Sequence, residues 1–167
     1  MLENIITSKT RLRLLMKFFI NSANNGHLRG LADEMNESTN AIRKELNNLS
    51  EAGYLEKHNE QNRISYRANS KHPLFDALQK IIRQHMGLDS LVSSILERMG
   101  NVRQIVLVGD YAKGIDSGII EVVLVGQNLN MNYIDKLVVK IEKEIHRKVQ
   151  FKAVEEFLEV GLVLYQE

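Results

Sequence analysis

Polar side chains recur after Ser38 at positions that would share one face of a helix: Thr39, Asn40, Arg43, Lys44 and Asn47. Arginine can bond bidentately to guanine and asparagine to adenine, while lysine and threonine can hold phosphates. Ser38 is a favourable N-cap, and the free N–H groups at a helix N-terminus also bind phosphate. We therefore predict that Ser38 and these five side chains bind double-stranded DNA.

The other face of this helix carries apolar residues at helical spacing. Ile42, Leu46 and Leu49 recur at intervals of four and three residues, which directs that face to a core. The helix is expected to end near Gly53, because glycine is the usual residue after a helix C-terminus. Packing of the apolar face therefore leaves the polar face exposed.

The surrounding segments predict three helices followed by a β-hairpin. The first two helices are expected over residues 8–22 and 28–35, and the strands over residues 54–58 and 63–68. Residues 59–62 are expected to form the turn, so Asn62 and Arg63 lie at the hairpin tip. We expect these two side chains to contact the minor groove or the DNA backbone.

The stretch STNAIRKELNNLSEAGYLEK, from Ser38 to Lys57, resembles the recognition helix and first wing strand of winged-helix regulators of the ArsR and MarR type. The resemblance covers roughly residues 8–70. It implies a winged helix-turn-helix and a sequence-specific, DNA-binding transcription regulator. The chain has no cysteine, which excludes a thiolate metal sensor. The alternatives are a solvated polar surface and a winged helix that binds protein, because a fold does not fix a function.

A second run of residues, from 109 to 122, follows a predicted strand and leads into another. It resembles the signature of minimal nucleotidyltransferases, in which a turn holds a triphosphate and paired aspartates bind metal ions. The candidate ligand-binding residues are Gly109, Asp110, Lys113, Gly114, Ser117 and Glu121.

This run departs from the transferase signature where catalysis depends on it. Asp110 stands where a phosphate-binding serine is expected, and Gly118 or Ile119 takes the place of the first aspartate. Glu121 alone could replace the second, and one carboxylate cannot balance the charge of two metal ions. We predict a transferase-like domain that is not an enzyme and that binds a small ligand or regulates. A plain glycine-rich connection, a transferase that has kept its activity, and an antitoxin-like interaction module are the alternatives.

The whole pattern predicts an α+β protein in three parts. Residues 1–72 form the winged helix, residues 73–100 a helical linker that serves dimerisation, and residues 101–167 the transferase-like domain. Further helices are expected over residues 73–86, 88–99 and 133–145, and strands over residues 102–108, 119–125 and 149–154. Residues 157–165 fit either a short helix or a strand. We expect a homodimer that associates through the two linker helices and the first helix.

Charge and composition set the remaining limits. Residues 1–86 have a net charge of +4 and residues 87–167 a net charge of −3, which suggests different partners for each half. The five histidines lack the spacing of metal ligands, so we expect no metal and no cofactor. No segment has the apolar length of a membrane span and the first residues do not resemble a signal peptide, so we expect a cytoplasmic protein.

Overall fold

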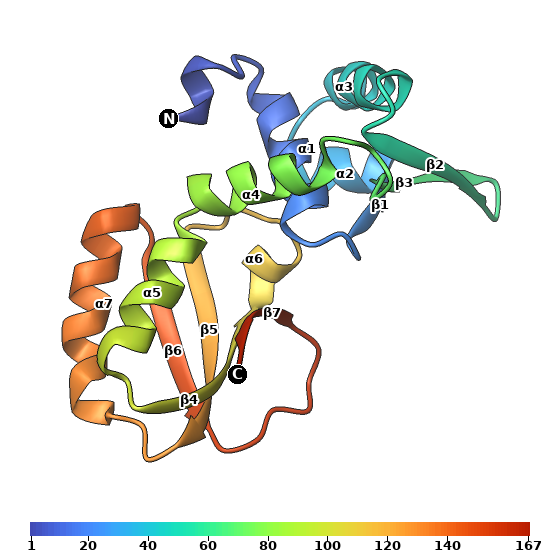
Figure 1. The fold of residues 1–167 in the computed structure, drawn as a ribbon. Coiled ribbons are helices and arrows are strands. Elements are labelled where there is room, and N and C mark those ends of the chain that lie inside the picture. Colours follow the sequence, from blue (N-terminus) through green and yellow to red (C-terminus); the bar gives the residue numbers. More distant parts are fainter. The chain divides into compact units, whose positions relative to one another are not determined.

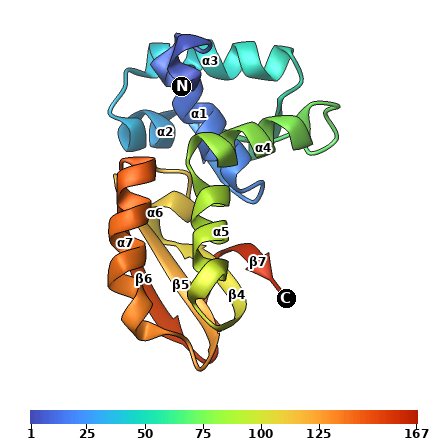
Figure 2. The same ribbon diagram turned by 60° about the vertical axis from the view of Figure 1, so that its left-hand side comes forward.

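The computed structural model describes all 167 residues, and they form two compact units, Met1–Ile82 and Arg83–Glu167 (Figures 1 and 2). The fold class is α+β, with seven α-helices and two β-sheets. The boundary between the units falls inside one helix, so the segment 73–100 is divided between them. None of the helices is long and apolar enough to span a membrane.

The N-terminal unit is built from helices and a three-stranded antiparallel sheet of order β1-β3-β2. Its elements are η1 (Leu2–Asn4), α1 (Lys9–Ile20), β1 (Asn25–His27), α2 (Leu28–Met35), α3 (Thr39–Glu51), β2 (Leu55–Glu60), β3 (Arg63–Ala68) and most of α4 (Phe75–His85). The expected helices and both expected strands are confirmed to within two residues. The apolar side chains of α1 are buried in this unit, so α1 serves as its core.

Strand β1 was not expected from the sequence, which predicted no strand between the first two helices. Asn25 to His27 pair with Arg67 to Ser65 of β3. A Cβ atom on Gly26 would lie 2.7 Å from Cδ2 of Leu31. The glycine therefore allows β1 to pack closely against α2 while it pairs with β3.

The β2–β3 hairpin turns more tightly than the sequence predicted. Strand β2 continues to Glu60, so only Gln61 and Asn62 form the turn. Both have positive φ, at 44° and 67°, which is the geometry of a two-residue turn that matches the strand twist. The prediction of a four-residue turn over 59–62 was wrong because Asn59 and Glu60 remain paired in the ladder.

The C-terminal unit contains a four-stranded mixed sheet of order β6-β5-β4-β7. Its elements after α4 are α5 (Leu88–Arg98), β4 (Asn101–Val108), α6 (Gly109–Ala112), β5 (Ile119–Gln127), α7 (Met131–Ile145), β6 (Lys148–Val154) and β7 (Leu162–Gln166). Strands β4 and β5 are antiparallel, whereas β5 and β6 are parallel and joined through α7. The tail that periodicity left open is a strand, β7, which pairs with β4.

The two faces of this sheet are covered differently. Helices α5 and α7 lie on one side of it, and the connection from β6 to β7, residues 155–161, runs on the other (Figure 1). On that second side Val106, Val123 and Val125 form a buried cluster against which Phe157 packs. The seven-residue connection therefore covers apolar side chains on one face of the sheet, whereas two helices cover the opposite face.

In the N-terminal unit, a buried carboxylate ties α3 to α1. Glu45, whose side chain is 7% exposed, accepts hydrogen bonds of 2.8 Å from Ser8 Oγ and from Arg11 Nε. Burial by itself raises the pKa of Glu45, but the bonds from Arg11 and Ser8 together lower it below its ordinary value. Ser8 also caps α1 by accepting from the backbone N–H of Arg11, so the three groups fix the start of α1 and the middle of α3 together.

Replacement of Glu45 by glutamine should lower the free energy of unfolding of this unit by about 1.5–3 kcal/mol, the range for hydrogen bonds to charged groups. Because the folded pKa of Glu45 is lowered, its stabilisation is present above the unfolded carboxyl pKa and is lost as the pH falls through the folded value. Hydrogen exchange of α1 and α3 amides at pH 7 measures the loss. The control is Glu37→Gln, which removes an ion pair with the half-exposed Arg13 and should cost less than about 1 kcal/mol. Equal losses of unfolding free energy in the two variants would contradict the role of Glu45 in holding α3 against α1.

Candidate nucleic-acid interface

The polar face of α3 is exposed over most of its length. Thr39, Asn40, Arg43 and Lys44 are exposed, and Asn47 is half-buried. Arg43 Nη1 donates a hydrogen bond of 2.7 Å to Asn40 Oδ1, which holds the two side chains together on the helix surface. Ser38 is the N-cap and accepts from the backbone N–H of Ala41 at 3.1 Å. Its side chain is therefore committed to starting the helix.

A cavity of about 540 Å³ lies between α3, the start of α2 and the β2–β3 hairpin. Four cationic side chains line it, Arg29, Arg43, Lys57 and Arg63, and no carboxylate does. A cleft that is lined by charges of one sign focuses the electric field. The four cations therefore concentrate a positive potential in this cavity. This cavity is suited to a polyanion.

Tyr66 of β3 also lines this cavity. Its side chain is buried, and burial raises its pKa while the positive charge of Arg43 partly offsets that rise. The ammonium of Lys57 lies 6.0 Å from the ring centroid of Tyr66, which is within the range of a cation–π interaction. Tyr66 therefore interacts with Lys57 through its ring and is affected by the charge of Arg43.

The structure brings together four of the eight residues that the sequence singled out for DNA. Arg43 and Asn47 from α3 share the cavity with Asn62 and Arg63 from the hairpin tip. Thr39, Asn40 and Lys44 are exposed on the same helix but do not line the cavity. Sequence reasoning missed His27, Arg29 and Lys57. Strand alternation was a usable signal for Lys57, since it lies directly opposite Tyr66 in the ladder.

The second candidate region, residues 109–121, adopts a different local structure from the loop that was expected. Gly109 to Ala112 form one helical turn, α6, and the backbone N–H groups of Lys113 and Ile115 both bond to the carbonyl of Asp110. A Cβ atom on Gly109 would lie 1.9 Å from Glu121 Oε2, so the glycine makes room for that carboxylate. Lys113 and Ser117 are exposed, and Gly114 is buried.

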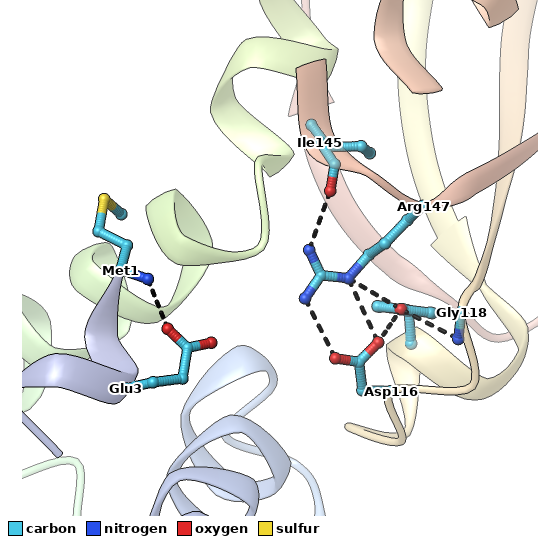
Figure 3. A network of polar contacts seen from close by, with 7 residues as sticks. Met1, Glu3, Asp116, Gly118, Ile145 and Arg147 are labelled. Atoms are coloured by element: carbon cyan, nitrogen blue, oxygen red, sulfur yellow. Dashed lines mark hydrogen bonds and ion pairs between the residues drawn. The ribbon is translucent and has the colours of Figure 1, made fainter. Parts of the chain in front are cut away.

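The polar centre of this region is Asp116, which the sequence did not single out. Arg147 donates to it twice, from Nη2 to Oδ2 at 3.1 Å and from Nε to Oδ1 at 3.3 Å (Figure 3). The hydroxyl of the buried Tyr111 donates to Asp116 Oδ1 and accepts from Gly118 N and Arg147 Nε. These bonds join the end of α6, the start of β5 and the residue before β6.

The same contacts set the ionisation of the three groups. Burial, together with the adjacent Asp116, raises the pKa of Tyr111 to about 12. Burial acts to raise the pKa of Asp116, but the bonds and charge of Arg147, with the bond from Tyr111, lower it below its ordinary value. Tyr111 is therefore neutral and Asp116 ionised at neutral pH.

The carboxylates of this region do not fit a two-metal site. Asp116 is already neutralised by Arg147, and no group of three or more His, Cys, Asp or Glu side chains in the chain is placed to hold a metal ion. Two divalent ions need several carboxylate oxygens converging on one point. The structure therefore brings together no set of carboxylates in this region that would suit two metal ions.

Comparison of the chain with protein-family models, with curated proteins and with solved structures found no match.

Asp116→Asn should lower the stability of the C-terminal unit by about 1 kcal/mol at pH 7, a value discounted because Asp116 is more than a third exposed. The lowered pKa means that Asp116 stabilises the fold above its unfolded pKa. That contribution disappears as the pH falls through the lowered pKa of the folded state. Hydrogen exchange of β5 and β6 amides at pH 7 and pH 3 should show wild type and variant converging at the acid end. Asp135→Asn, at an exposed position of α7, should change neither value. A constant difference at both pH values would disprove the linkage.

Proposed function

We propose that the N-terminal unit is a winged helix-turn-helix that binds double-stranded DNA and that the protein regulates transcription. The observation that carries the proposal is the cavity between α3 and the hairpin, with four cations and no carboxylate on its walls. A duplex presents one phosphate charge per about 1.7 Å of its axis, so a cationic concavity matches it better than it matches most protein surfaces.

The distribution of ion pairs in this unit supports the proposal. Glu34, Glu37, Glu45 and Glu56 are paired with Lys17, Arg13, Arg11 and Arg67, none of which lines the cavity. Arg29, Arg43, Lys57 and Arg63 take part in no such pair. A cation that is already neutralised by a carboxylate gains little from a phosphate. An unpaired cation can neutralise a phosphate and thereby release the counterions that are condensed on the DNA.

In the proposed complex α3 lies in the major groove and the hairpin follows the backbone. Asn40, Arg43 and Lys44 face the bases and phosphates from α3, and Arg63 extends from the hairpin tip. The hydrogen bond between Arg43 and Asn40 reduces the freedom that Arg43 loses on binding. A homodimer with two-fold symmetry would read two half-sites about one helical turn apart.

Arg43→Ala should weaken binding to the preferred sequence by about 5- to 150-fold, which corresponds to about 1–3 kcal/mol for a base contact. Binding is measured by fluorescence anisotropy on a duplex selected from a random pool with the wild-type protein, over a series of salt concentrations. The matched control is Arg67→Ala, which removes the same charge from a residue paired with Glu56 outside the cavity. The control should bind within about twofold of wild type. If no duplex shows salt-sensitive binding, the proposal fails.

Lys57→Ala should affect all sequences alike. Removal of one phosphate contact should reduce the slope of log affinity against log salt by about 1, with little change in sequence preference. The measurement repeats the salt series on the selected duplex and on a scrambled one. A loss confined to the selected duplex would place Lys57 at a base, and no loss on either would remove it from the interface.

For the C-terminal unit, we propose a regulatory or ligand-binding role without nucleotide transfer. The support is the engagement of Asp116 by Arg147 and of Glu121 against Gly109, which leaves no converging pair of carboxylates. Incubation with labelled nucleotide, Mg²⁺ and cell extract should transfer no label. Transfer that is lost in Glu121→Gln would overturn this part of the proposal and restore the transferase alternative.

A further inference from the structure

Residues 155–161, the connection from β6 to β7, present two aliphatic side chains almost completely to solvent. Leu158 is 93% exposed and Val160 is 99% exposed. Single exposed apolar residues are common on protein surfaces, but two of them on one short connection need a reason.

The connection is anchored on both sides of these residues. The carbonyl of Glu155 accepts a hydrogen bond from Arg103 Nη2, and Phe157 packs against the cluster of Val106, Val123 and Val125. At the far end a Cβ atom on Gly161 would lie 2.5 Å from Val106 Cγ1, so the backbone is seated directly on the sheet. The backbone is fixed at both ends, and the same segment that buries Phe157 turns Leu158 and Val160 away from the core.

A cavity of about 490 Å³ adjoins these side chains. Val125, Phe157 and Leu158 supply its apolar lining, and three glutamates, Glu155, Glu156 and Glu167, also line it. The one cation there, Arg103, is bonded to the Glu155 carbonyl. Glu159 adds a fourth carboxylate between Leu158 and Val160, and none of the four takes part in an ion pair.

We propose that this surface, the apolar–acidic surface of residues 155–160 with the adjoining cavity, is a docking site for a basic, aliphatic peptide segment of a partner protein. The aliphatic side chains of such a segment cover Leu158 and Val160, and a lysine or arginine enters the cavity beneath the carboxylates. The charge argues against a second copy of the chain as occupant. A two-fold axis through this surface would place the glutamates of one copy against those of the other.

The inference is independent of DNA binding, because every residue that carries it belongs to the C-terminal unit. Partner binding at this surface would give the acidic half of the chain a role separate from that of the basic half.

Selection of random dodecapeptides on the immobilised full-length protein tests the proposal. Peptides that also bind the double variant Leu158→Ser/Val160→Ser are subtracted, which removes ligands of every other surface. The peptides that remain should carry a net charge of at least +2 and branched aliphatic residues. Enrichment of neutral or acidic peptides, or no enrichment over the variant, would overturn the proposal.

The best synthetic peptide then serves as the probe for charge and apolar variants. Glu156→Gln/Glu159→Gln and Leu158→Ser/Val160→Ser should each weaken it at least tenfold, and the loss in the glutamine variant should shrink at high salt. The matched controls lie on α7: Glu144→Gln removes an exposed carboxylate, and Val139→Ser removes an apolar side chain that is 69% exposed. Both should bind the peptide like wild type. Sedimentation of the unliganded protein tests whether a second copy of the chain occupies this surface instead. If Leu158→Ser/Val160→Ser dissociates an oligomer, the surface is an interface between copies and the proposal is overturned.

Discussion

The bond between Glu45 and the Ser8–Arg11 pair is the interaction on which the N-terminal surface depends. A carboxylate in the middle of α3 would otherwise lie only two residues from Arg43, on the helix that carries the cationic face. Because Ser8 and Arg11 hold it against α1, the charge of Glu45 is buried on one side of α3 and Arg43 and Lys44 are exposed on the other. The bonds from Ser8 and Arg11 therefore orient α3 and also keep the carboxylate of Glu45 away from the cationic face.

The elements of the N-terminal unit were predictable because their signals are local. Ser38 starts α3 and Gly53, with a φ of 79°, follows its end, while Ile42, Leu46 and Leu49 define its buried face. The pairing of β1 with β3 was not predictable, since it depends on the contact between Gly26 and Leu31 rather than on any strand pattern. For the same reason the sequence indicated Arg43 and Arg63 but not Arg29, whose place at the cavity depends on how α2 packs.

In the C-terminal unit the motif and the structure emphasise different residues. The resemblance indicated Asp110, Ser117 and Glu121 as candidate ligand-binding residues. In the structure, however, the polar bonds of this region converge on Asp116. The reason is that the partner of Asp116 is Arg147, 31 residues further along the chain, and no local pattern connects the two. Tyr111 also lies within the run of residues 109–122, and in the structure its buried hydroxyl links Asp116 to the backbone N–H of Gly118.

A chain with a cationic surface and an acidic one must avoid binding itself, and the two surfaces differ enough in chemistry to do so. Four cations without a carboxylate partner line the cavity beside α3, and in the proposed complex a duplex would offer them a continuous row of phosphates. The connection of residues 155–160 offers a few carboxylates, and its aliphatic side chains would still be exposed if only those charges were matched. A polyanion would therefore match the cavity better than this connection does, whereas only a partner that is both basic and aliphatic would match the acidic surface. The two surfaces therefore select different partners because the wrong partner would leave phosphate-binding cations unpaired at one surface and aliphatic side chains exposed at the other. The opposite sign of their charges is the only difference in charge that this selection requires.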